Sequence, residues 1–168
     1  MRIDITEIAG INGAYIGVEE DVPSREIIAV KSDVQLGESI HVDLKIEYFE
    51  GMIIVTGVVS GEYHAVCGRC LADIDGKFNI DFRENFMHAS EMTDESDDYY
   101  KYEGGYIELA APLIDNILLD LPSVMLCSGD CKGLCSSCGR NLNDGECSCD
   151  HSDHGINLQM EKLKDFFD

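Results

Sequence analysis

Apolar and polar residues alternate through much of the first half of the chain. Residues 40–48 place an apolar side chain at every second position, which is the period of a β-strand with one buried face. Residues 52–59 are almost continuously apolar, which predicts a strand buried on both faces, with a bulge or bend at Gly57 or Gly61. Residues 78–83 alternate again and predict the returning strand. Other strand-like segments are residues 2–5, 26–30 and 62–66.

The segment that follows these strands is strongly acidic. Residues 84–105 hold many carboxylates and few aliphatic side chains. We interpret the segment as an exposed acidic loop, because it lacks the apolar residues that a buried element needs. An alternative interpretation is a docking arm for a basic partner, in which Tyr99, Tyr100 and Tyr102 would make the contacts.

Two later segments have helical periodicity. Residues 106–121 carry two apolar rows at helical spacing, which predicts a core helix with Pro112 in its first turn and an end before Pro122. Residues 156–167 predict a short amphipathic helix. This helix either packs against the rest of the chain or is offered to a partner.

With 168 residues, of which 45% are hydrophobic, the chain can form one core domain with a small appendage. The pattern predicts an α+β fold, mainly antiparallel β as a sandwich or partly closed barrel, with one central helix, a C-terminal cysteine-rich zinc-knuckle module and a short terminal helix. We expect two domains. Residues 1–122 form the β-rich core, including the acidic loop 84–105 and the helix 106–121, and residues 123–168 form the zinc module with the C-terminal helix.

Acidic residues outnumber basic ones by 33 to 12, which gives a formal net charge of -21. Proteins bind nucleic-acid backbones through cations that displace counterions, so this balance argues against broad nucleic-acid binding. It fits a role in solubility or a basic partner such as a ribosomal protein. The first residues do not have the pattern of a secretion signal, and the chain has no run of 18 apolar residues, so we expect a cytoplasmic protein without a membrane segment.

The eight cysteines form four close pairs. They are Cys67 and Cys70, Cys127 and Cys131, Cys135 and Cys138, and Cys147 and Cys149. In a reducing compartment, such pairs indicate metal ligands more readily than disulfides. Two thiolates on a tight turn can face one Zn²⁺, and a closed tetrahedral site needs two such pairs. Four pairs therefore predict two structural zinc sites.

The spacing favours one way of combining the pairs. Only eight residues separate Cys138 from Cys147, and a loop of this length closes easily. We therefore assign Cys135, Cys138, Cys147 and Cys149 to one site. The other four cysteines would form a second site that joins the tip of a β-hairpin to the chain after the helix.

Other arrangements of the cysteines stay open. A single zinc with spare cysteines, disulfides, or an iron–sulfur cluster on the same ligands would each use part of this set. His151 and His154 follow Cys149 closely and could replace thiolate ligands. Residues 127–149 contain only Leu134 and Leu142 as aliphatic side chains, so metal binding rather than a hydrophobic core is expected to fix this segment.

Three sequence motifs follow one another along the chain. They are Cys67-Gly68-Arg69-Cys70-Leu71 after a strand, Leu119-Asp120-Leu121-Pro122 at the end of a helix, and Cys131-Lys132-Gly133-Leu134-Cys135-Ser136-Ser137-Cys138-Gly139-Arg140-Asn141-Leu142-Asn143 followed by Cys147-Ser148-Cys149. In this order they resemble the YceD family of bacterial and plastid proteins, over roughly residues 25–167. The chain departs from the family at Ser136, where proline is frequent, and at residues 153–155, where Asp-His-Gly replaces Asp-Pro-Arg. Some relatives lack most of the C-terminal cysteines, so the resemblance does not make the second metal site essential to the family's role.

The resemblance implies a part in ribosome biogenesis, namely the accumulation of large-subunit ribosomal RNA. The chain has no phosphate-binding glycine loop, nucleophile elbow or HExxH motif, so we expect a non-enzymatic protein without a small-molecule substrate. It would bind ribosomal RNA, a basic large-subunit ribosomal protein or both through a zinc-stapled surface. The candidate contact residues are Arg69, Lys132, Arg140, Asn141 and Asn143. The alternatives are a zinc-thiolate redox sensor and a chaperone of a basic ribosomal protein that does not contact RNA.

Overall fold

The structure, a computed structural model, describes residues 1–26, 34–91 and 99–149. The chain forms two compact units. The first unit contains Met1–Gly68 and Ala72–Cys127, and the second contains Arg69–Leu71 and Ser128–Asp168. Among the described residues, no helix has the length and apolar character needed to cross a membrane.

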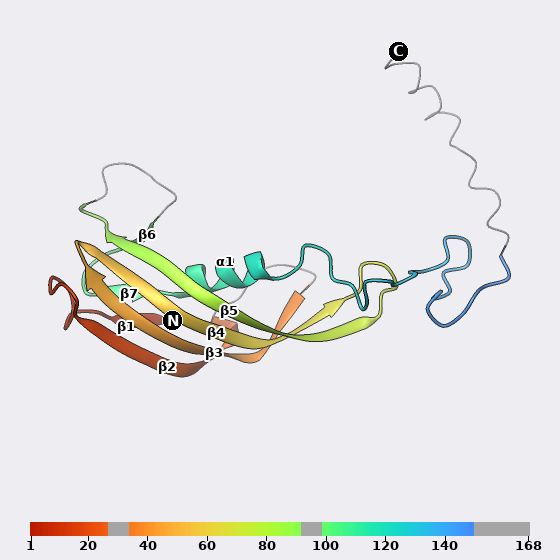
Figure 1. Cartoon of the computed structure of the whole chain (residues 1–168), viewed down its shortest axis with the longest axis horizontal. Coiled ribbons are helices and arrows are strands. Elements are labelled where there is room, and N and C mark those ends of the chain that lie inside the picture. The colour runs from red at the N-terminus through yellow and green to blue at the C-terminus, as the bar shows by residue number, and fades with distance from the viewer. Residues whose placement is uncertain (27–33, 92–98, 150–168) are drawn as a thin grey trace, which may run out of the picture. The chain divides into compact units, whose positions relative to one another are not determined.

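A five-stranded sheet forms the framework of the first unit (Figure 1). In spatial order its strands are β2 (Tyr15–Pro23), β3 (Val34–Phe49), β4 (Met52–Val66), β5 (Asp73–His88) and β6 (Tyr100–Tyr102). The first four strands run antiparallel to one another, and β6 pairs parallel with β5. Strands β2 and β6 are therefore the edges of the sheet. The tight turn between β3 and β4 has φ values of 48° at Glu50 and 90° at Gly51, which suit a two-residue hairpin loop.

Smaller elements complete the first unit. Strand β1 (Arg2–Asp4) pairs antiparallel with β7 (Tyr106–Glu108), and the helix α1 (Ala110–Asp120) begins shortly after β7. A short 3-10 helix, η1 (Ser24–Glu26), follows β2. As predicted, Pro112 lies in the first turn of α1, where a missing N–H costs little, and Leu121 is already extended before Pro122.

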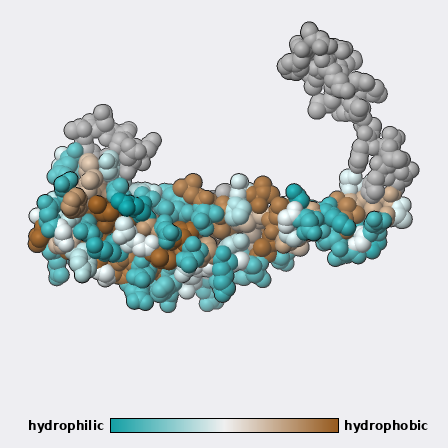
Figure 2. Space-filling model, in the orientation of Figure 1, coloured by the Kyte–Doolittle hydropathy of each residue, from teal (hydrophilic) through white to brown (hydrophobic). Residues whose placement is uncertain are grey.

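One face of the large sheet carries the core. Strand β3 buries alternate apolar residues from Ile40 to Ile46 and exposes His41, Asp43 and Lys45 between them. Leu113 and Ile117 from α1, Ile107 from β7 and Ile5, which follows β1, join the same buried cluster. Burial of each such side chain stabilises the fold by about 1.5–3 kcal/mol. On the face that Figure 2 shows, hydrophilic residues cover most of this unit and hydrophobic residues form separate patches.

The predicted strand over residues 52–66 is confirmed, but its burial is different from the prediction. Ile53, Val55 and Val59 are buried, whereas Val58 is 39% exposed. The strand is thus buried on one face only, because the core elements cover a single face of the sheet. The irregularity in pairing lies between Leu36 and Ile40 of β3, at the position of Gly61, and the pairing is regular at Gly57.

Gly57 has a different role from the predicted bulge. A Cβ atom at this position would lie 2.0 Å from the backbone oxygen of Asp43 on the neighbouring strand. Such a distance is far below a van der Waals contact. Glycine is therefore required here by the close approach of β3 and β4.

The prediction of one exposed loop over residues 84–105 is wrong at both ends. Residues 84–88 complete β5, and Tyr100–Tyr102 forms β6. Phe86 and Tyr102 are buried, and the ring centroid of Tyr100 lies 5.5 Å from that of Phe86. These aromatic side chains bring the segment onto the sheet, which removes Tyr100 and Tyr102 from the proposed exposed docking arm. Residues 92–98 lie outside the described residues.

Residues 106–121 contain the predicted helix, but a strand that was not predicted precedes it. Tyr106–Glu108 is a strand that pairs with Arg2–Asp4 and buries Ile107, so the helix starts only at Ala110. Within the described residues, the strands form one five-stranded and one two-stranded sheet, and the finer expectation of a sandwich or partly closed barrel stays a prediction. The expectation of a mainly antiparallel β fold with one helix is confirmed. Of the predicted strand at 26–30, Glu26 ends the 3-10 helix η1, and the other residues lie outside the described residues, as does the predicted helix at 156–167.

Candidate metal centres

The first cysteine cluster consists of Cys67, Cys70, Cys127 and Cys131. The four Sγ atoms lie within 4.8 Å of one another. With Zn–S bonds of about 2.3 Å, the sulfurs of a tetrahedral site are about 3.8 Å apart, so the cluster has the size of such a site. Cys67, Cys70 and Cys131 are buried, and Cys127 is exposed. The structure thus brings together the four cysteines that the spacing assigned to one site.

Backbone hydrogen bonds hold the turn that carries the first pair of this cluster. The N–H of Cys67 donates to the oxygen of Ala72 at 2.8 Å, which closes the end of the β4–β5 hairpin. The N–H of Gly68 donates to the oxygen of Met125 at 2.8 Å. The N–H of Cys127 donates to Sγ of Cys67 at 3.4 Å, a contact that favours the thiolate form of the sulfur. These hydrogen bonds join the end of β4 to the segment after α1.

The second cluster consists of Cys135, Cys138, Cys147 and Cys149, whose Sγ atoms also lie within 4.8 Å of one another. The N–H groups of Ser137 and Cys138 both donate to Sγ of Cys135 at 3.4 Å. This arrangement is a knuckle, in which a turn points its N–H groups at one sulfur. Cys135 is buried, Cys138 is exposed, and the other two ligands are partly exposed.

The local hydrogen bonds affect the acidity of two of these thiols. The N–H of Cys138 is the largest cause that lowers the pKa of Cys135, to about 6. A hydrogen bond with the side chain of Cys138 raises the pKa of Cys149 to about 12. The hydrogen bonds of this turn thus favour the thiolate form of Cys135. A bound divalent cation would displace the thiol protons, because metal ligation requires the thiolate.

The second unit has almost no hydrophobic core among its described residues. The buried positions within 128–149 are Cys131, Gly133 and Cys135, and both Leu134 and Leu142 are partly exposed. Burial of two cysteines cannot offset the conformational entropy of ordering a segment of this length. The segment needs a further source of stability, and ligation of its sulfurs by metal would supply it.

Three of the five candidate contact residues take part in local structure. Arg69 donates from its guanidinium to the backbone oxygen of Cys131 at 3.0 Å. Asn141 and Asn143 are bonded to each other, since Nδ2 of Asn143 donates to Oδ1 of Asn141 at 2.8 Å. The side chains of the other two, Lys132 and Arg140, are exposed. Contact of these five residues with a partner stays a prediction.

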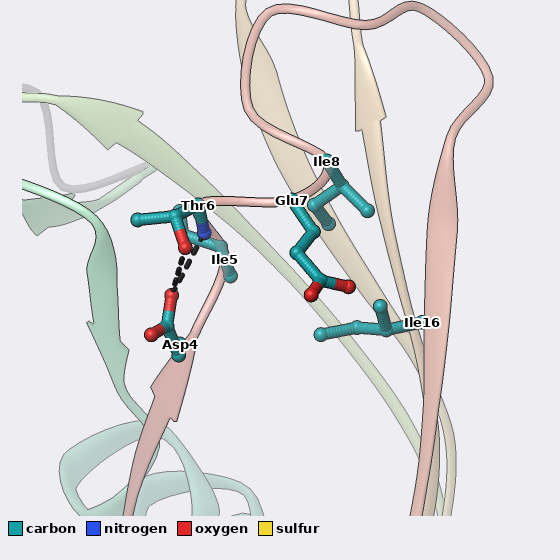
Figure 3. A pocket seen from close by; sticks show the side chains of 6 residues that line it. All are labelled: Asp4, Ile5, Thr6, Glu7, Ile8 and Ile16. Carbon is teal, nitrogen blue, oxygen red and sulfur yellow. Dashed lines mark hydrogen bonds between the residues drawn. The ribbon is translucent and has the colours of Figure 1, made fainter.

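A hollow beside β1 is lined by acidic and apolar residues. Its volume is about 170 Å³, and it is lined by Asp4, Ile5, Thr6, Glu7, Ile8 and Ile16 (Figure 3). The carboxylate of Asp4 accepts hydrogen bonds from the hydroxyl of Thr6 at 2.6 Å and from its N–H at 2.9 Å. These bonds lower the pKa of Asp4, so the carboxylate is a stable anion that caps a turn.

A second hollow, of about 410 Å³, lies on the exposed face of the sheet. It contains a histidine, a carboxylate and a serine in one row across the strands, because His41 pairs with Asp21 on β2 and with Ser60 on β4. Nδ1 of His41 lies 2.9 Å from Asp21. In the part of the chain that the structure describes, no hydrogen bond connects Ser60 with His41.

Comparisons with known proteins agree on the relationship of the chain. The family described as large ribosomal RNA subunit accumulation protein YceD matches residues 55–167. An uncharacterized protein of Mycobacterium leprae (strain TN) is 32% identical over 143 residues, which cover 83% of this chain and 66% of that protein. An uncharacterized protein of Mycobacterium tuberculosis (strain ATCC 25618 / H37Rv) is 31% identical over 147 residues, which cover 83% and 69%. The uncharacterized protein YlbN of Bacillus subtilis (strain 168) is 24% identical over 112 residues, which cover 67% and 65%.

The residues that the family matches include both cysteine clusters. Residues 55–167 include all eight cysteines and the hairpin between β4 and β5 that carries the first pair. The chain spans about two thirds of the length of the relatives that it matches. No solved structure matches it. The chain belongs to the family described as large ribosomal RNA subunit accumulation protein YceD.

Proposed function

We propose that this protein is a non-enzymatic factor for the accumulation of large-subunit ribosomal RNA. In this proposal it binds ribosomal RNA, a basic large-subunit ribosomal protein or both through a zinc-stapled surface. The observation that carries the proposal is the pair of four-cysteine clusters within the residues that the family matches. The description of the family supports a role in the accumulation of ribosomal RNA, and the cysteine clusters support metal binding.

Zinc suits both clusters because of the donor set. Four thiolates are soft ligands that prefer zinc or an iron–sulfur cluster, and zinc accepts them in a tetrahedron of the observed size. A closed four-thiolate site leaves no open coordination position, so the ion would serve folding rather than catalysis. Its role is then to fix a segment that has almost no core of its own.

The charge of the loaded protein favours a basic direct partner. Each site adds -2, since four thiolates carry -4 and the ion carries +2, so two sites change the formal charge from -21 to about -25. This charge repels a phosphate backbone, although Lys132 and Arg140 lie exposed beside the clusters. We therefore favour contact with a basic ribosomal protein, or with RNA that such a protein contacts at the same time. This function would place the protein in the cytoplasm, where thiols stay reduced.

The exposure of the second cluster favours one further candidate function. Cys138 is exposed, and Cys147 and Cys149 are partly exposed, so an oxidant in solution can reach these ligands. A zinc-thiolate redox sensor would release its ion when these sulfurs are oxidised. Titration with peroxide, followed by zinc release and partner binding, separates the two functions. Partner binding that persists after complete zinc loss would contradict the sensor.

Metal content is the first test of the proposal. The full chain is purified without added metal, and zinc and iron are measured by elemental analysis. We expect two zinc ions per chain, and one ion per chain in the double variant C135S/C138S. A matched control is S137A, which changes the residue between these ligands and should keep both ions. A chain without bound metal would contradict the proposal.

The partner and the process need a second test. Capture of the full chain from cells, with and without nuclease, distinguishes a protein partner that stays bound from one that depends on RNA. In cells that lack the gene, we expect less large-subunit than small-subunit ribosomal RNA, restored by the wild type and not by C67S/C70S. Equal amounts of the two RNAs in the absence of the gene would contradict the proposed process.

A further inference from the structure

Asn143 holds together the two ends of one short hairpin. Its Oδ1 accepts a hydrogen bond from the backbone N–H of Lys132 at 2.8 Å. Its Nδ2 donates to Sγ of Cys131 at 3.3 Å and to Oδ1 of Asn141 at 2.8 Å. Because the N–H of Lys132 can only donate, the carbonyl oxygen of Asn143 must face it, and the amide nitrogen must face the sulfur. The orientation of the side chain is therefore set by its partners.

The hairpin from Cys131 to Asn143 carries ligands of both clusters. Cys131 at its start belongs to the first cluster, and Cys135 and Cys138 at its turn belong to the second. Its two sides are joined at three pairs of residues, namely Gly133 with Leu142, Leu134 with Asn141 and Cys135 with Arg140. These pairs connect the turn directly to the end of the hairpin at Asn143.

We propose that Asn143 is a positioning residue that couples metal binding at the two clusters, so that an ion in either cluster raises the affinity of the other. The inference rests on the proposed function, because it requires both clusters to bind metal. An ion in the second cluster fixes the turn of the hairpin and thereby holds the amide of Asn143 against Cys131. The first cluster then loses less conformational entropy when it binds its own ion. By thermodynamic linkage the effect is equal in both directions.

The hydrogen bond to the sulfur also has a direct effect on the first cluster. An amide N–H stabilises the negative charge on a ligating thiolate, and loss of such an outer partner costs about 10–100-fold in metal affinity. This effect alone would be local and would not depend on the second cluster. Coupling requires that Asn143 raises the metal affinity of the first cluster by a larger factor when the second cluster holds an ion.

Titration with Co²⁺ measures the coupling directly. Anaerobic, metal-free full-length protein is titrated, and the sulfur-to-cobalt charge-transfer absorption gives the binding constants. The variants C135S/C138S and C67S/C70S each leave one cluster and give its constant alone. The product of the two constants in the intact chain, divided by the product of the two separate constants, is the coupling factor. We expect a factor of about 10 or more, which corresponds to about 1.4 kcal/mol or more.

Substitution of Asn143 should remove the coupling. In N143A we expect the factor to fall to about 1, and in C135S/C138S the added N143A should shift the charge-transfer band to lower energy, because the thiolate loses a hydrogen-bond donor. N143D keeps an acceptor for Lys132 but replaces the donor with a carboxylate, whose charge repels the sulfur of Cys131, so it should also abolish the coupling. The control is D144N, whose side chain makes no hydrogen bond among the described residues and which should keep the wild-type factor.

The outcomes separate this inference from the proposed function. Two bound ions with a factor near 1 in the wild type would overturn the inference and leave metal binding intact. A factor that N143A and N143D both preserve would also overturn it. A wild-type chain that binds no ion would overturn the inference together with the metal-binding function.

Discussion

Removal of metal should open the second unit and leave the first unit folded. The first unit has 22 buried core residues, whereas the buried positions within 128–149 are two cysteines and a glycine. Structural zinc contributes on the order of 10 kcal/mol of folding free energy, which corresponds to about 10⁷-fold in the equilibrium between closed and open segments. Without this contribution, the described part of the second unit has no comparable source of folding free energy.

Hydrogen exchange followed by mass spectrometry, with and without a chelator under reducing conditions, tests this expectation. The amides of Leu134, Cys135 and Leu142 are hydrogen-bonded in the structure, so they report the closed state. Their exchange should accelerate by several orders of magnitude, whereas amides of β3 and β4 should change by less than about tenfold. Continued protection of residues 128–149 in protein shown to be metal-free would refute the reasoning.

Two further predictions concern the first unit. Gly57→Ala should lower the free energy of unfolding by about 1–3 kcal/mol in urea denaturation, because its Cβ meets the oxygen of Asp43, whereas Gly17→Ala has open space and should change it by less than about 0.5 kcal/mol; equal effects would contradict the close approach. Burial, with a hydrogen bond to Asp115, raises the pKa of Tyr100 above its ordinary 10.0, so its contribution to stability is present below about pH 10 and is lost as the pH rises. Tyr100→Phe should therefore flatten the fall in stability between about pH 9 and 11, and an unchanged slope would show that the phenol does not titrate differently in the folded state.

The periodicity of the sequence predicted those strands whose two faces differ in polarity. Residues 40–48 alternate cleanly, and the structure has them in β3. The strand β2 (Tyr15–Pro23) gave no such signal, because Glu19, Glu20 and Asp21 interrupt the alternation near its end. It forms through its pairing with β3, which is a tertiary effect that local periodicity does not contain.

The acidic segment misled the prediction for a related reason. The many carboxylates of the segment indicated an exposed loop, but a few aromatic residues determine its structure. Phe86, Tyr100 and Tyr102 pack on the sheet or at its edge. Similarly, Tyr106–Glu108 continues the apolar pattern of the helix that follows it, but it forms a strand that pairs with Arg2–Asp4. Both outcomes depend on partners that are distant in sequence.

The grouping of the cysteines could be predicted because loop length limits which pairs can meet. The spacing of Cys135, Cys138, Cys147 and Cys149 led to the same cluster that the structure contains. The role of Asn143 could not be predicted in this way. An asparagine in a glycine-rich turn has no distinctive pattern, and only the coordinates show that its amide faces a sulfur.

The acidic residues of β2 also bear on self-association. An edge strand presents unpaired N–H and C=O groups to which a strand of another molecule can add. At this edge Glu19, Glu20 and Asp21 follow one another, and Pro23 ends the strand without an N–H to donate. A second copy that approached in register would bring like charges together along the new ladder. Like-charge repulsion therefore disfavours the addition of a further strand at β2, which limits growth of the sheet at this edge.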